Sequence, residues 1–175
     1  TIGLSETKSV LKVMRKGKLS GFVGAWCNDF DGGPFIRKIE ERWCQIFKTR
    51  HSITVNSNTS GLIAALGAIG LSPGEEVIVP PMTMSATVMA PLIYGGIPVF
   101  VDLEKDFFCL DYKKVESSIT NKTKAIIAVN LFGHPAELQK LRKLADRKGI
   151  YLIEDSAQCP LATENDKFAG TIGHI

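Results

Sequence analysis

The sequence predicts an α/β fold, a three-layer structure in which a mostly parallel sheet lies between helices. Two observations predict it. Short, almost wholly apolar runs recur along the chain, and stretches with helical spacing of their apolar residues separate them. A half-exposed strand alternates apolar and polar residues, whereas a continuous apolar run indicates burial on both faces, as in parallel sheets. The runs are 77–79, 99–101, 125–129 and 151–153.

Length and composition limit the class of protein. The chain has 175 residues, and we expect residues 1–175 to form a single domain. Hydrophobic residues make up 45% and charged residues 22%, which excludes a disordered tail or a coiled coil. The net charge of +3 is small and dispersed, so we expect no nucleic-acid partner. No apolar stretch is long enough to span a membrane and no signal-peptide layout is present, so we expect no membrane association and a cytoplasmic location.

The four cysteines, Cys27, Cys44, Cys109 and Cys159, form no C-x-x-C pair and have no histidine at metal-ligand spacing. We therefore expect no metal site. Reduced thiols packed as small hydrophobes are the favoured interpretation, and a single disulfide is the alternative.

The first third of the chain predicts two helices and a strand. Apolar residues at helical spacing, followed by Gly17, predict a helix over 5–18. Pro34 suits a first helical position, and the apolar spacing after it predicts a helix that reaches Phe47. A short apolar run predicts a strand over 51–55.

From there on, helices and strands alternate. We expect helices over 59–69, 83–94, 111–119 and 135–148, and strands over 76–79, 98–102, 124–129 and 151–154. The helix from Pro135 is the best determined, because Pro135 suits the first turn and Gly149 provides a left-handed end. The stretch 161–175 predicts a hairpin or a loop that feeds another strand, and we expect the chain to be part of a larger protein.

Polar residues follow three of the expected strands, where parallel α/β sheets bind their ligands. The loop 56–60, Asn-Ser-Asn-Thr-Ser, places hydroxyls and backbone N–H groups at a helix N-terminus, which suits a phosphate. The alternative is an ordinary helix cap, since these residue types are favoured there. The loop 80–85 carries Met82 and Met84, which could contact a flat ring or fill the core.

The third loop, 154–158, follows a fully apolar strand with an acidic pair. A carboxylate at Asp155 stays ionised beside a cation such as a protonated ring nitrogen, and Gln158 could hydrogen-bond a ring oxygen. The alternatives are that Asp155 is only a cap or turn residue and that Gln158 is a solvated side chain of the loop. A phosphorylated pyridine cofactor needs all of these functions together.

The stretch from Gly33 to the end of the chain resembles the N-terminal part of the DegT/StrS-type sugar aminotransferases, which use pyridoxal 5′-phosphate (PLP). The matching segments are 32–43, 55–87, 95–104, 120–138 and 153–162. The resemblance implies the large domain of the PLP fold-type-I enzymes, incomplete here, with the C-terminal small domain absent.

The resemblance also implies roles for six cofactor-binding residues: Asn58, Thr59, Ser60, Met84, Asp155 and Gln158. Thr59 and Ser60 match the pair that binds the phosphate, and Met84 falls where a residue stacks on the pyridine ring. Asp155 matches the partner of the ring nitrogen, and Gln158 the residue at the phenolic oxygen. Three positions depart from the pattern: Asn58 replaces a glycine, Met84 an aromatic ring, and Cys159 a common histidine.

The Schiff-base lysine of this family lies beyond the matched region, so we name no catalytic residue within 1–175 and expect no turnover by this chain alone. The implied function of the full-length protein is transfer of an amino group, from glutamate, to a nucleotide-linked keto-sugar in amino-sugar or polysaccharide biosynthesis, by a homodimer. The alternatives are a PLP-dependent sugar dehydratase with histidine in place of the lysine, a noncatalytic homologue, and a flavodoxin-like or nucleotide-binding domain.

Overall fold

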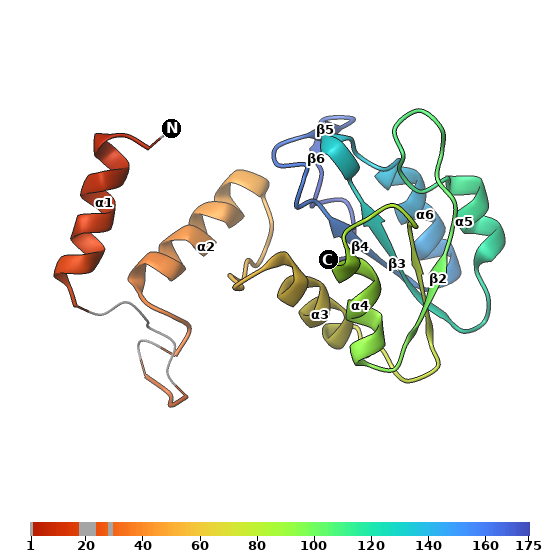
Figure 1. Ribbon diagram of the computed structural model, residues 1–175, viewed down its shortest axis with the longest axis horizontal. Helices are drawn as coiled ribbons and strands as arrows, with labels where there is room; N and C mark the ends of the chain where they lie inside the picture. The colour runs from red at the N-terminus through yellow and green to blue at the C-terminus, as the bar shows by residue number, and fades with distance from the viewer. Residues whose placement is uncertain (1, 18–23, 28–29) are drawn as a thin grey trace. The chain divides into compact units, whose positions relative to one another are not determined.

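The structure, a computed structural model, describes residues 2–17, 24–27 and 30–175 (Figure 1). The chain divides into two compact units, Thr1–Thr54 and Val55–Ile175, which are described separately. The expected single domain over residues 1–175 stays a prediction. In the described part of the chain, no helix is long and apolar enough to cross a membrane.

The first unit contains two helices, α1 (Leu4–Arg15) and α2 (Pro34–Phe47). Pro34 occupies the first turn of α2, as predicted. Gly17 has a φ of 65° just after α1, which confirms it as the stop, although the helix ends three residues before the predicted end and Lys18 lies outside the described residues. Glu40 on α2 accepts hydrogen bonds from the backbone N and the Oγ1 of Thr54, at 2.7 and 2.8 Å.

The predicted strand over 51–55 is wrong. These residues have no regular secondary structure. The side chain of Ile53 is 82% exposed. Without a neighbouring strand to pair with, an apolar run gains neither ladder hydrogen bonds nor burial, and its β preference alone does not order it.

The second unit contains a four-stranded sheet made of β1 (Glu76–Val79), β2 (Ile97–Phe100), β3 (Thr123–Val129) and β4 (Tyr151–Asp155). The strand order is β2-β1-β3-β4, and every pair is parallel. This confirms the parallel sheet predicted from the apolar runs.

Helices cover both faces of the sheet. Helices α3 (Asn58–Ala68) and α4 (Ser85–Ile93) lie on one face, and α5 (Tyr112–Ser118) and α6 (Leu138–Lys148) on the other (Figure 1). Successive residues of β3 enter different cores: Ile127 packs with Leu62 and Leu66 of α3, and Ile126 with Leu141 of α6. Burial on both faces explains why these strands lack alternation.

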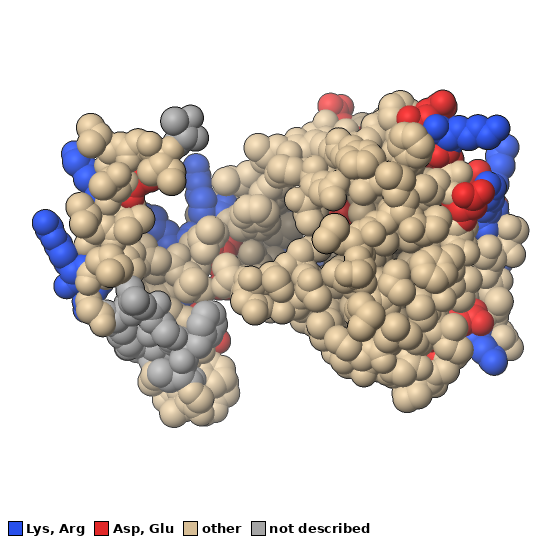
Figure 2. Space-filling view, in the orientation of Figure 1, with Lys and Arg blue, Asp and Glu red and all other residues tan. Residues whose placement is uncertain are grey.

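Charged side chains gather on the side of this unit that carries α5 (Figure 2). Lys114 pairs with Asp102 at 2.5 Å, and Arg147 with Glu116 at 2.6 Å. Helices α3 and α4, by contrast, carry no charged residue. Exposed pairs of this kind contribute little to the free energy of unfolding, because water and salt screen them. The two buried apolar cores stabilise the unit.

The predicted start of α6 at Pro135 is wrong, because the helix begins at Leu138. The backbone N of Ala136 donates to Oδ1 of Asn130 at 2.9 Å, and Glu137 has a φ of 43°. Both features keep residues 135–137 outside the helix. These residues come shortly after a 3₁₀ turn (Leu131–Gly133). At the other end, Gly149 adopts the left-handed conformation with a φ of 67°, as predicted.

The segment after β4 forms the predicted hairpin, with β5 (Thr163–Glu164) antiparallel to β6 (Lys167–Phe168). The carboxylate of Glu154 binds the loop after β6. It accepts hydrogen bonds from the backbone N of Gly170 and of Ile172, both at 2.6 Å, and from that of Gly173. Burial raises the pKa of Glu154 although these donors oppose the shift.

Candidate functional site

A pocket of about 210 Å³ opens at the carboxyl ends of β3 and β4. Its lining comes from four places in the second unit: the start of α3, the start of α4, the end of β3, and the end of β4 with the loop after it. Open parallel sheets bind their ligands at this edge. The lining residues are Asn58, Thr59, Thr83, Met84, Ala86, Val129, Asp155, Ala157 and Gln158.

Asp155, the last residue of β4, is the charged group of this pocket and is only 7% exposed. Its Oδ1 accepts hydrogen bonds from Nδ2 of Asn58 at 2.9 Å and from the backbone N of Ala157 at 3.2 Å. Within the described chain, no donor reaches the other oxygen, Oδ2. One carboxylate oxygen is therefore held by the protein and the other is available to a ligand.

The N-terminus of α3 provides an anion-binding end. Ser57 caps the helix, and its Oγ accepts from the backbone N of Ser60 at 3.2 Å. Helix starts leave backbone N–H groups without partners in the helix, and the helix dipole adds partial positive charge. Thr59 lies in this first turn and lines the pocket. The ordinary helix cap, which was the alternative interpretation of this loop, is present at Ser57. The same loop also contributes Thr59 to the pocket.

Ser60 does not line the pocket. Its Oγ donates to Oδ1 of Asn56 at 2.6 Å and lies 3.2 Å from Oγ of Ser57. The hydroxyl is thus engaged within the cap, and the assignment of Ser60 to a phosphate stays a prediction.

Met84 and Gln158 complete the set of predicted residues in the pocket. Met84 is 67% exposed and precedes α4, so it does not fill the core. Gln158 lines the pocket and accepts at Oε1 from the backbone N of Phe132 at 3.1 Å, and no described residue accepts a hydrogen bond from its Nε2. Their roles toward a cofactor stay predictions.

Asn130 is a supporting residue that the sequence reasoning missed. It is fully buried at the end of β3, and its backbone N donates to the carbonyl of Asp155 at 2.9 Å. Its Nδ2 donates to Oγ of Ser156 at 2.9 Å, and its Oδ1 accepts from Ala136. Asn130 therefore joins the ends of β3 and β4 beside the pocket. The sequence could have indicated this role, because Asn130 is a polar residue directly after the buried apolar run 125–129 and a buried polar side chain needs hydrogen-bond partners.

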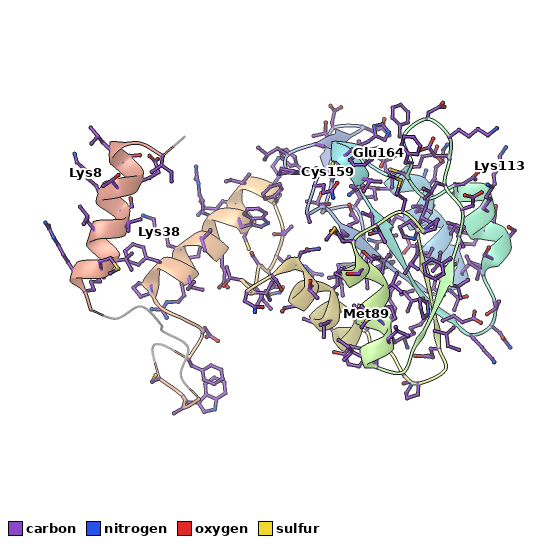
Figure 3. All side chains as sticks on the ribbon, viewed as in Figure 1. Lys8, Lys38, Met89, Lys113, Cys159 and Glu164 are labelled. Atoms are coloured by element: carbon purple, nitrogen blue, oxygen red, sulfur yellow. The ribbon has the colours of Figure 1, made fainter. Side chains whose placement is uncertain are left out.

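Cys159 lies outside the pocket. It is buried in the same core cluster as Cys109, and Figure 3 labels its position in the second unit. Burial raises the pKa of both thiols. No disulfide joins any two of the four cysteines, all of which lie in the described part of the chain, so the disulfide alternative is wrong. Over the described ranges, no group of three or more His, Cys, Asp and Glu side chains is arranged to hold a metal ion.

Comparison with known proteins decides the family. The model of the DegT/DnrJ/EryC1/StrS aminotransferase family matches residues 24–175. The chain belongs to this family. The expected resemblance is confirmed, and the flavodoxin-like alternative is wrong.

Among curated members of the DegT/DnrJ/EryC1/StrS family, the GDP-perosamine synthase of Escherichia coli O157:H7 is 37% identical over 143 residues. The match covers 82% of this chain and 39% of that protein. The chain thus spans about two fifths of the length of this relative.

Solved structures agree with the fold. The aminotransferase from Psychrobacter cryohalolentis is 28% identical with a TM-score of 0.90, over 99% of this chain and 42% of that one. The E. coli GDP-4-keto-6-deoxy-D-mannose-3-dehydratase with bound hydrated PLP is 26% identical with a TM-score of 0.87, over 99% and 43%. These likenesses confirm the three-layer α/β fold of the fold-type-I enzymes.

Proposed function

We propose that the full-length protein is a PLP-dependent nucleotide-sugar aminotransferase that moves an amino group from glutamate to a nucleotide-linked keto-sugar in amino-sugar biosynthesis. The observation that carries the proposal is the Asp155 carboxylate, which is almost buried, lines the pocket, and has an oxygen, Oδ2, to which no described residue donates. The similarity to a GDP-perosamine synthase supports the nucleotide-linked sugar as substrate class, and the similarity to the Psychrobacter aminotransferase supports the amino transfer. We also propose a cytoplasmic homodimer whose Schiff-base lysine lies outside residues 1–175.

The residues present fit PLP. The pocket combines a carboxylate oxygen for a cationic ring nitrogen with the N-terminus of α3 for an anionic phosphate. Met84 offers an apolar, polarisable surface to a ring, and Nε2 of Gln158 offers a donor to a ring oxygen. When bound, PLP supplies an electron sink at the reacting amine.

Each residue then has a distinct task in the proposed reaction. Asp155 keeps the proton on the ring nitrogen through its free Oδ2, because a nearby negative charge favours the protonated form. The first turn of α3, with Thr59, binds the phosphate and fixes the position of the ring. Gln158 orients the ring oxygen while the backbone N of Phe132 holds its amide in place.

A sugar dehydratase is the second candidate. It is supported by the dehydratase structure that matches 99% of this chain with a TM-score of 0.87. The pocket described above serves either enzyme, because both use the same cofactor.

The decisive experiment supplies the full-length protein with PLP, glutamate and GDP-4-keto-6-deoxymannose. We expect an amino-sugar nucleotide and an equal amount of 2-oxoglutarate, measured by mass spectrometry. A product that has lost its 3-hydroxyl and gained no amino group would favour the dehydratase. Well-folded protein that takes up no PLP at large excess would overturn both.

Thr59→Ala in the full-length protein is expected to raise the concentration of pyridoxamine 5′-phosphate (PMP) needed for half-occupancy about tenfold, because a hydrogen bond to a charged phosphate is lost. PMP binds without a covalent bond, so equilibrium dialysis measures this affinity directly. Thr171→Ala is the matched control, since the Thr171 hydroxyl donates to the carbonyl of Phe168 and lies outside the pocket. An unchanged PMP titration in Thr59→Ala removes Thr59 from the phosphate site.

A further inference from the structure

Asn58 contacts the charged group of the pocket rather than acting only as part of a turn. It is the first residue of α3, and Asp155 is the last residue of β4, 97 positions further along the chain. The amide Nδ2 of Asn58 donates to Oδ1 of Asp155 at 2.9 Å. In the resemblance drawn above, this position usually carries glycine, which has no side chain to make such a bond.

The two donors to Asp155 both bind the same oxygen. Besides Asn58, the backbone N of Ala157 reaches Oδ1 at 3.2 Å. Two bonds on Oδ1 from different elements restrict rotation of the carboxylate about its Cβ–Cγ bond, and they leave Oδ2 as the oxygen available to the pocket. Donors to a charged acceptor hold it more strongly than donors to a neutral one.

We propose that Asn58 is a positioning residue, which turns the Asp155 carboxylate so that Oδ2 faces the nitrogen of the cofactor ring. This proposal rests on the proposed function, because it presumes a pyridine cofactor in the pocket. This role differs from phosphate binding. Asn58, on α3, acts on the ring nitrogen through its hydrogen bond to Asp155 on β4.

The test compares two probes in the full-length apoprotein: PMP and its 1-deaza analogue, in which a C–H group replaces the ring nitrogen. Asn58→Ala keeps a good helix former at the start of α3 and removes the amide. We expect Asn58→Ala to weaken PMP binding about tenfold, the worth of one hydrogen bond to a charged group, and to leave binding of the deaza analogue unchanged. Asn58→Gly should give the same pattern, which guards against a folding defect in either variant.

Asn56→Ala is the matched control. It makes the same chemical change in the same loop, and it removes the acceptor of the hydrogen bond from Oγ of Ser60 while leaving the bonds of Asp155 in place. We expect it to retain the wild-type ratio of the two affinities. A loss of equal size for both probes in Asn58→Ala, or no loss for either, overturns the positioning role while the proposed function stands. Wild-type protein that takes up neither probe overturns the proposed function and this role with it.

Discussion

Asp155→Asn in the full-length protein is expected to lower the rate of amino transfer by about a hundredfold or more, while the fold is retained. The amide oxygen of the variant can still accept from Asn58 and from the backbone N of Ala157, which both bind Oδ1 in the wild type. Its NH₂ group then replaces Oδ2 on the side of the pocket. A neutral donor there cannot hold a proton on a ring nitrogen, so the cofactor loses its electron-sink character.

The measurement is kcat for amino transfer, together with the midpoint of thermal unfolding. Asp111→Asn is the matched control, because Oδ1 of Asp111 also accepts two hydrogen bonds, from the backbone N of Lys113 and of Lys114 at the start of α5. We expect Asp111→Asn to affect stability at most. If Asp155→Asn transfers amino groups at the wild-type rate, the role assigned to Asp155 is wrong.

Asn130→Ala is expected to lower the free energy of unfolding by about 2–3 kcal/mol. The variant leaves the buried backbone N of Ala136 without its acceptor and Oγ of Ser156 without its donor. It also opens a cavity between the ends of β3 and β4. Because Ser156 follows Asp155 directly, we expect PMP affinity to fall as well. Urea unfolding and PMP dialysis measure the two effects.

Thr123→Ala separates the structural effect from the functional one. Thr123 is a buried polar residue at the opposite end of β3, where its Oγ1 accepts from the backbone N of Thr120 at 2.9 Å. We expect this variant to lose stability and to keep wild-type PMP affinity. An unfolding free energy of Asn130→Ala within about 0.5 kcal/mol of the wild type would show that the buried bonds of Asn130 add nothing measurable.

Local signals predicted most elements of the second unit. The apolar runs at 77–79 and 125–129 required burial on both faces, and the structure has them inside a parallel sheet between helices. Gly149 ends α6 as its φ preference requires. Two of the errors, the strand over 51–55 and the start of α6, occur where a distant partner decides. No described strand pairs with 51–55, and the side chain of Asn130 binds the backbone ahead of α6.

The residues of the candidate site also fall into those that local signals predicted and those that depend on distant partners. The sequence by itself determined which residues end the strands and begin the helices, so five of the six predicted residues line one pocket. Only the tertiary structure decided that the Ser60 hydroxyl binds within the helix cap, that Asn130 joins the ends of β3 and β4, and that Asn58 reaches Asp155. The physical reason is that periodicity and capping act within a few residues, whereas a hydrogen bond between α3 and β4 depends on how the whole sheet is packed.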